Sequence, residues 1–115
     1  MRSGDIVLTL LHQADGHAKL RPTLVLCVLP PFDDVLVCGI SSQLRQRVPD
    51  FDDLIDHDDP DFARTGLAAP SIVRLGFLAT VPQSIIKGRI GVLPPPRVGL
   101  LRQRLAKLLA DAPTR

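Results

Sequence analysis

Hydrophobic residues dominate two runs within residues 19–43, where the chain reads KLRPTLVLC and then DVLVCGISSQ. Both runs carry aliphatic side chains at successive positions, a pattern typical of strands that are covered on both faces. Residues 30–34, between the runs, contain two prolines that cannot continue a hydrogen-bonded ladder and two aspartates that favour a turn. The pattern predicts two central antiparallel strands whose polar ends, around Arg21 and Ser41, meet at one end of the sheet.

Shorter hydrophobic runs elsewhere in the chain predict further strands. These strands are expected over residues 4–11, 51–56, 70–75 and 87–93. In the short run FDDLID, Phe51 and Leu54 are expected to face inward. Gly88 and Gly91, both in the last strand, indicate strong curvature or a close backbone approach.

The segments between these strands are rich in polar residues, glycine and proline. Residues 12–19 and 44–64 are predicted to be loops, and residues 76–84 are predicted to turn, with one helical turn that begins near Thr80 or Pro82. No composition break divides the chain, so residues 1–115 are expected to form a single domain.

A run of three prolines introduces the last element of the chain. Proline suits the first turn of a helix, where its missing N–H is not needed. The positions that follow at three- and four-residue spacing are apolar: Val98, Leu101, Leu105 and Leu108. The predicted fold class is therefore mainly β with short helices (α+β), a small antiparallel barrel-like sheet with a C-terminal helix packed on it.

The formal net charge of +2 conceals an uneven distribution of charge. Seven of the twelve acidic residues lie between Pro49 and Phe62, a segment without Lys or Arg, so the rest of the chain carries 14 basic against 5 acidic groups. A basic body attracts polyanions if its charges share a face, and scattered solvated charge is the alternative. The acidic segment lacks the glycine and glutamate of an EF-hand loop, so a solvated acidic loop is expected, with a generic divalent-cation site as the alternative.

The remaining composition indicates neither a metal site nor an exported protein. Cys27 and Cys38 fall inside the central strands and are expected to be small buried residues, although a cross-strand disulfide is geometrically conceivable in an oxidising compartment. His12, His17 and His57 are too scattered for a zinc site. No apolar run approaches the ~18 residues that span a bilayer, and no cleavable signal is present. A cytoplasmic location without membrane contact is expected.

Five segments resemble, in order along the chain, the MazF/PemK family of toxins from bacterial toxin–antitoxin pairs. They are Gly4–Val7, Lys19–Pro22 before an aliphatic strand, Ile40–Ser42, Gly66–Leu67 followed by PSIVRLGFLATVP, and IIKGRIGVL before the C-terminal helix. The resemblance implies an SH3-like, CcdB-like barrel that forms a homodimer. It also implies an endoribonuclease, needing neither metal nor cofactor, that cuts single-stranded RNA at short sequences to 2′,3′-cyclic phosphate and 5′-hydroxyl ends.

The same resemblance implies two catalytic residues and a protein partner. The family's catalytic arginine falls on Arg21, and its catalytic hydroxyl, usually threonine, falls on Ser41. The chemistry of these side chains agrees, because a guanidinium stabilises the extra negative charge of a phosphorane and a hydroxyl donates to a phosphoryl oxygen. The partner is a cognate antitoxin whose disordered tail covers the dimer groove, and an acidic tail would suit the basic body.

Other residues are candidates for subsidiary roles. The expected RNA contacts are Lys19, Ser42, Gln43, Lys87 and Arg89. For Lys87 and Arg89, regular alternation predicts one shared face, which either extends a basic groove or is merely solvated. His17 is a candidate for proton transfer, because imidazole titrates near neutral pH. With four Phe and neither Tyr nor Trp, base stacking on aromatic side chains is expected to be limited.

Two other functions remain open at this point. CcdB-type relatives of the same barrel poison DNA gyrase by binding it, without cleaving anything. A barrel that has lost catalysis and serves only as a binding partner is the third possibility. The presence of Arg21 and of a hydroxyl at Ser41 favours the ribonuclease.

Overall fold

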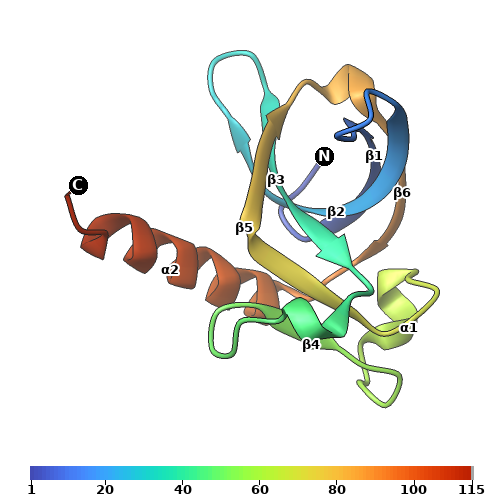
Figure 1. Cartoon of the computed structure of the whole chain (residues 1–115), viewed down its shortest axis with the longest axis vertical. Helices are drawn as coiled ribbons and strands as arrows, with labels where there is room; N and C mark the ends of the chain where they lie inside the picture. The colour runs from blue at the N-terminus through green and yellow to red at the C-terminus, as the bar shows by residue number, and fades with distance from the viewer. Residues whose placement is uncertain (115) are drawn as a thin grey trace.

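Six antiparallel strands form one curled sheet, and a long helix extends from it at the C-terminal end (Figure 1). This computed structural model describes residues 1–114; Arg115, the last residue of the predicted domain, lies outside the described residues. The strands are β1 (Asp5–His12), β2 (Ala18–Leu29), β3 (Asp34–Ser41), β4 (Asp53–Ile55), β5 (Ser71–Val81) and β6 (Ile86–Val92). The helices are α1 (Phe62–Thr65) and α2 (Pro95–Asp111), with the 3-10 turns η1 (Leu44–Gln46) and η2 (Gln83–Ile85).

The strands follow the order β4-β5-β3-β2-β1-β6, and each neighbouring pair is antiparallel. β2 and β3 lie at the centre and are joined by a turn at residues 30–33, as the hydrophobic pattern predicts. The sheet bends into a half-barrel (Figure 1). The predicted fold class, a mainly β, SH3-like antiparallel barrel with a C-terminal helix, is confirmed.

Alternate residues of the central strands enter two different hydrophobic clusters. Leu24 and Leu26 of β2 join Cys38 of β3 in the larger cluster, which α2 covers. The intervening positions join a second cluster, made of Val7, Val25, Val35, Val37 and Val81. Coverage on both faces is what successive aliphatic residues in a strand predict.

The two cysteines are free thiols, with Cys38 buried and Cys27 half-buried. In the β2–β3 register Leu24 lies opposite Cys38, and Cys27 lies opposite Leu36, so the two thiols do not face each other. Burial raises the pKa of the Cys38 thiol to about 12, with a smaller contribution from the negative charge of Asp52. Cys38 therefore stays protonated at neutral pH and acts as a small core residue.

Helix α2 packs on the sheet through only part of its predicted apolar stripe. Val98, Leu101 and Leu105 are buried in the larger cluster. Leu108, which the spacing places in the same stripe, is 49% exposed. The prediction for Leu108 is wrong because α2 extends past the edge of the half-barrel, so its last turns have no sheet to pack against (Figure 1). None of the helices in residues 1–114 has the length and apolar composition needed to cross a bilayer.

Strand β5 is longer than its sequence pattern suggests. The predicted strand ends at Leu75, whereas β5 continues to Val81 and its second half pairs with the first half of β3. The glycine at position 76, taken as the start of a turn, lies inside a bulge of the strand instead. The expected helical turn near Pro82 is present as η2.

Two other strands differ in detail from expectation. β4 is present, but it has three residues and buries Ile55, while Leu54 and Phe51 are half-buried. In β6, a side chain on Gly91 would collide with the backbone of Thr65 at 2.2 Å, so the predicted close approach is confirmed there. Gly88 has no such neighbour.

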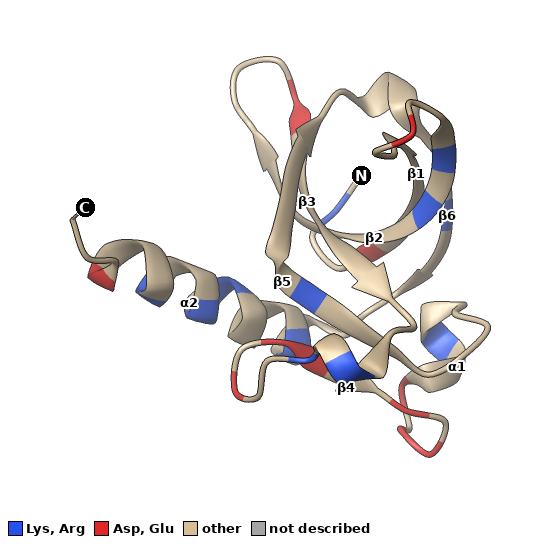
Figure 2. Cartoon of the chain, in the orientation of Figure 1, with Lys and Arg blue, Asp and Glu red and all other residues tan. Residues whose placement is uncertain are grey.

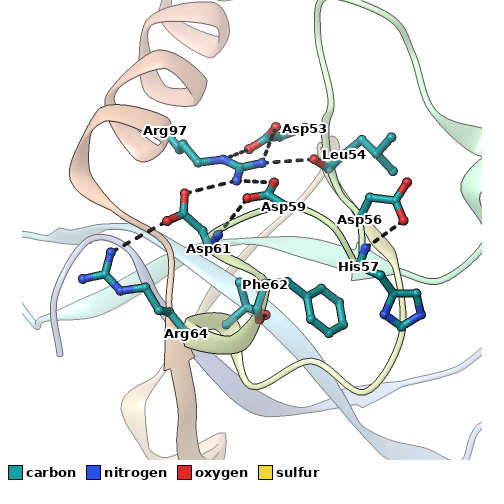
Figure 3. A network of polar contacts seen from close by, with 10 residues as sticks. Asp53, Leu54, Asp56, His57, Asp59, Asp61, Phe62, Arg64 and Arg97 are labelled. Carbon is teal, nitrogen blue, oxygen red and sulfur yellow. Dashed lines mark hydrogen bonds and ion pairs between the residues drawn. The ribbon is translucent and has the colours of Figure 1, made fainter.

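The acidic segment is not a simple solvated loop, which corrects the sequence-based expectation. Three of its carboxylates, those of Asp53, Asp59 and Asp61, surround the guanidinium of Arg97 at the start of α2 (Figure 3). The first turn of α2 contains no acidic residue and Pro94 provides no side-chain cap. These carboxylates neutralise the guanidinium of Arg97, whose positive charge is otherwise unfavourable near a helix N-terminus.

Candidate functional site

One face of β1, β2 and β3, here called the valine face, carries buried valines. They are Val7 on β1, Val25 on β2, and Val35 and Val37 on β3. Because side chains alternate along a strand, every second residue farther along each strand belongs to the same face. Continuing in this way, the valine face reaches Thr9 on β1, Thr23 on β2 and Gly39 on β3.

The two threonines mark the end of the apolar cluster. The Oγ atoms of Thr9 and Thr23 lie 2.9 Å apart in a hydrogen bond, and both residues are fully buried. One hydroxyl donates to the other, and the hydroxyl of Thr23 also lies 3.5 Å from the backbone oxygen of Val7, which accepts from it, so both buried polar groups have partners. Since Thr23 pairs with Gly39, the next positions on this face are Arg21 of β2 and Ser41 of β3.

Beyond the threonines the face opens into a groove of about 620 Å³. Its walls come from the ends of β1 and β3, the start of β2, the first half of β5 and residues 67–69. Four of the predicted site residues line it: Arg21, Ser41, Ser42 and Gln43. The meeting of the polar strand ends, inferred from the antiparallel pattern, is therefore found in the structure.

Arg21 is exposed and weakly held. It lies opposite Thr9 in the sheet, and its Nη2 donates a 3.3 Å hydrogen bond to Oε1 of Gln13. Among the described residues it has no ion pair with a carboxylate. Pro22 follows it directly and keeps its backbone extended. Most of its N–H donors are thus available to a ligand in the groove.

Ser41 is oriented by the backbone that follows it. Its Oγ accepts a 3.0 Å hydrogen bond from the backbone N–H of Gln43, where the chain leaves β3. This contact uses a lone pair of the oxygen and leaves the hydroxyl hydrogen free. The hydroxyl can therefore donate to an anionic ligand in the groove.

The remaining predicted residues do not line the groove. Lys19 shares the face of Arg21 by alternation but lies farther out on β2. His17 is exposed, with its Nδ1 3.5 Å from Oδ2 of Asp15.

Lys87 and Arg89 on β6 are engaged elsewhere. Lys87 falls in a bulge of β6 and its Nζ donates to the backbone oxygen of Ser84 at 3.0 Å. Arg89 pairs with Asp5 at 3.1 Å, from Nε to Oδ1. The bulge breaks the regular alternation from which a shared face was inferred.

Among the lining residues that the sequence did not single out for a site are His12, Arg74 and Phe77. The sequence held a signal for Arg74, because a single arginine inside the apolar run SIVRL needs a polar destination. Arg74 lies opposite Gly39 and makes no ion pair within residues 1–114. His12 and Phe77 carried no comparable signal.

The groove is basic, and the largest group of acidic residues lies outside it. Figure 2 shows basic positions on β2 and β5, while acidic positions gather in the loops next to β4 and α1, where some basic positions also lie. Two arginines, Arg21 and Arg74, line the groove, and none of the described residues that line it is acidic. No group of His, Cys, Asp and Glu within residues 1–114 has the arrangement of a metal site. The groove is therefore suited to an anion.

These features define a class of protein: a small antiparallel half-barrel with a basic, hydroxyl-bearing groove at the polar end of its sheet. A family model described as "PemK-like, MazF-like toxin of type II toxin-antitoxin system" matches residues 2–109. The match spans most of the chain, and the chain therefore belongs to the family of PemK-like, MazF-like toxins. An antitoxin partner follows from membership in a type II toxin–antitoxin family.

Solved structures agree with this family. The Mycobacterium tuberculosis toxin MazF-mt6 is 25% identical over 92% of this chain and 96% of its own, with a TM-score of 0.67. A second structure, described as an Mtb toxin, is 24% identical over 89% of this chain and 97% of its own, with a TM-score of 0.60, and it supports the fold alone. None of the curated proteins matches the chain.

Proposed function

We propose that this chain is the toxin of a type II pair and acts as a metal-independent endoribonuclease on single-stranded RNA, as one domain over residues 1–115. The observation that carries the proposal is that Arg21 and Ser41 line one groove that also holds Arg74 and no acidic side chain among its described lining residues. A guanidinium and a hydroxyl without a carboxylate suit the binding of a phosphate rather than of a cation. Membership in the MazF-like family supports the same activity.

The reaction proposed is attack of the ribose 2′-oxygen on the adjacent phosphorus. The new P–O2′ bond forms as the P–O5′ bond breaks, so the products are a 2′,3′-cyclic phosphate and a 5′-hydroxyl. The proton of the 2′-hydroxyl is lost, and the departing 5′-oxygen gains one. The phosphorane between these states carries more negative charge than the starting diester, so groups that donate to its oxygens lower the barrier.

Arg21 and Ser41 take the two donor roles. The guanidinium of Arg21 offers two parallel N–H groups to the phosphorane oxygens and stays charged at any working pH. Ser41, held through its lone pair by the N–H of Gln43, presents its free hydrogen to a phosphoryl oxygen and so orients the scissile phosphate. Arg74 is positioned to bind the same phosphate or a neighbouring one.

Proton transfer is assigned to a histidine at the groove. His12 lines the groove, whereas His17 is exposed beside Asp15, so His12 is the better supported candidate of the two. Ser42 and Gln43 are proposed to contact RNA within the groove, and Lys19 to contact a phosphate just outside it.

The assembly proposed for this toxin follows the same family. A homodimer in the cytoplasm is neutralised by an antitoxin whose disordered tail folds over the basic groove on binding. An acidic tail complements Arg21 and Arg74 and competes with RNA for them. Co-purification of the chain with the product of the neighbouring gene tests this partner.

The deciding experiment incubates the purified chain with a long single-stranded RNA in EDTA and maps the cut ends. Discrete cuts with 5′-hydroxyl ends are expected from the wild-type chain, and Arg21→Ala is expected to make them far more slowly. Folded wild-type protein that leaves the RNA intact would contradict the proposal and favour a toxin that acts by binding, as CcdB-type relatives do. A gyrase pull-down then separates that function from a barrel that binds only its antitoxin.

A further inference from the structure

We propose that Phe77 forms a stacking platform for one unpaired nucleobase beside the scissile phosphate, an inference that rests on the proposed ribonuclease function. Phe77 is 48% exposed although it lines the groove together with Arg21 and Ser41. An exposed aromatic face beside cationic side chains is the combination with which proteins hold single-stranded nucleic acid. The small number of aromatic residues led to the expectation of little base stacking. A single ring in the right position is, however, enough to stack on one base.

A large bulge in β5 projects Phe77 into the groove. Cys38 of β3 pairs with Leu78, but the next residue of β3, Gly39, pairs with Arg74. Residues 75–77 of β5 therefore lie opposite a single step of β3. A bulge redirects the side chains it contains, and such departures from a regular ladder are common beside functional sites.

Burial and hydrogen bonds hold the backbone of the bulge in one conformation, so the position of Phe77 is well defined. Leu75 is completely buried in the larger cluster. Its backbone N–H has no partner on β3 and donates instead to Oδ1 of Asp52 at 3.0 Å. Oδ2 of the same carboxylate accepts from the N–H of Val48 at 2.8 Å, and Asp52 is itself only 6% exposed. These contacts fix the backbone next to Phe77 before any ligand binds.

Gly39 provides the space that the ring occupies. A Cβ at position 39 would lie 2.8 Å from Cδ1 and 3.2 Å from Cγ of Phe77. The ring thus lies against the backbone of Gly39, two residues before Ser41 on the same face of β3. Any larger residue at position 39 must displace the ring. One side of Phe77 is supported by β3, and the exposed part of the residue is left for a ligand.

The ligand chemistry follows from these neighbours. A flat apolar ring in the same groove as Arg21 and Arg74 suits a ligand that alternates flat π-systems with negative charges, which is a nucleic acid strand. A base within a duplex is already stacked on both sides and cannot reach such a ring. The platform therefore selects unpaired RNA and places the next phosphate near Ser41.

Affinity for RNA tests the platform separately from catalysis. The probe is an RNA that spans the mapped cut, with the attacking 2′-hydroxyl replaced by hydrogen so that it binds without being cut. Removing the ring in Phe77→Leu is expected to weaken binding about tenfold to hundredfold, as loss of one base stack does. Phe77→Tyr keeps an aromatic face and is expected to bind like the wild type.

The matched control is Phe32→Leu. Phe32 is 83% exposed and lies in the β2–β3 turn, at the opposite end of β3 from Ser41. Equal binding by Phe32→Leu and the wild type is expected. Gly39→Ala retains the ring but displaces it, so it is expected to weaken binding in the same direction as Phe77→Leu.

Removing single bases from the probe identifies the contact. In the wild type, an abasic site at one position is expected to weaken binding, and in Phe77→Leu the same change is expected to have no further effect, because the partners act as a unit. Equal affinities of Phe77→Leu and wild type would overturn the inference while the ribonuclease stands. A change in dimerisation of Phe77→Leu with unchanged affinity of the dimer for RNA would overturn it as well.

If the wild type cuts no RNA, the same affinities are measured on a labelled single-stranded RNA of mixed sequence. Weaker binding by Phe77→Leu, with normal binding by Phe32→Leu, would support the platform although the proposed cleavage had failed. Absence of any binding by the wild type would overturn both proposals.

Discussion

Arginines in two regions of this molecule differ sharply in how their hydrogen bonds are used. Arg97, at the start of α2, has a guanidinium surrounded by acceptors: Nε and Nη2 bind the two oxygens of Asp53 at 3.0 and 3.1 Å, and Nη1 binds Asp59 and Asp61. Nη2 also donates to the backbone oxygen of Leu54 at 3.0 Å (Figure 3). Arg21, in the groove, has one long contact with Gln13.

The difference shows that an arginine side chain can stabilise the fold in one region and be available to bind a ligand in another. Arg97 is 21% exposed, and its donors are committed to the acidic loop, so it attaches that loop to α2. Arg21 and Arg74 face an open groove with most donors unused. A committed guanidinium stabilises the fold, whereas an uncommitted one is available to a phosphate.

The largest effect is expected at Arg21. Arg21→Ala is expected to lower kcat/KM for RNA cleavage by about 10²–10³-fold, because removal of one preorganised donor to a developing oxyanion has a cost of this size. The free energy of unfolding is expected to stay within about 0.5 kcal/mol of wild type, since the side chain is exposed. Initial cleavage rates and urea unfolding measure the two quantities. Arg102→Ala, an exposed arginine on α2, is the matched control, and equal rates for both variants would contradict the assignment.

The opposite result is expected at Arg97. Arg97→Met is expected to lower the free energy of unfolding by about 2–3 kcal/mol, because three clustered carboxylates lose their common cation. Cleavage per folded molecule is expected to remain near wild type. Urea unfolding at neutral pH measures the effect, with Arg102→Met as the control for loss of charge on the same helix. A stability equal to that of the control would show that the network is only a surface contact.

A smaller effect on catalysis is expected at Ser41. Ser41→Ala is expected to slow cleavage about tenfold to hundredfold, which corresponds to one lost hydrogen bond to a charged group, roughly 1.5–3 kcal/mol. Ser41→Thr retains the oxygen and is expected to recover most of the rate. Single-turnover cleavage measures both variants. Equal rates for the alanine and threonine variants would remove the hydroxyl from the mechanism.

A pH dependence of stability is expected from Asp59. Burial by itself raises the pKa of this carboxyl, but the hydrogen bond from the Asp61 backbone and the contact with Arg97 outweigh it and lower the pKa below its usual value near 3.8. The stabilisation is therefore complete above about pH 5 and is lost as the pH falls through the folded-state value. Urea unfolding between about pH 7 and pH 3 is expected to show this loss in the wild type and a weaker loss in Arg97→Met. Parallel curves for both proteins would contradict the role of Arg97.

The smallest effect on RNA binding is expected from substitution of basic side chains outside the groove. Lys19→Ala is expected to reduce the slope of log K against log salt for RNA binding by about 0.7, the contribution of one phosphate contact on a single strand. Arg89→Ala is expected to leave the slope unchanged, because Arg89 is engaged with Asp5. Lys87→Ala is expected to behave likewise. Anisotropy titrations at several salt concentrations measure the slopes, and a reduced slope in Arg89→Ala would extend the groove to β6.

Local sequence patterns were sufficient to predict most of the strands and some of the residues that line the groove. Aliphatic runs broken by Pro30 and Pro31 predict β2 and β3, and an antiparallel pair necessarily brings Arg21 and Ser41 to one end of the sheet. The same patterns failed at Leu75, where a glycine suggested a turn and the strand continued. Gly76 does lie in an irregular segment, the bulge at residues 75–77, but the strand resumes after it because residues 78–81 pair with β3 and so satisfy their backbone groups.

The sequence by itself determined the central strand pair, the helix that follows the sheet and the position of the two proposed catalytic residues, since these depend on side-chain periodicity and on neighbours along the chain. Only the tertiary structure decided which charged and aromatic side chains are free to contact a ligand in the groove. Asp53 and Arg97 are 44 residues apart and neutralise each other, and Phe77 reaches the groove through a bulge. Contacts between distant segments depend on how the sheet curls and on which backbone groups remain to be satisfied, and no local pattern of residues encodes either.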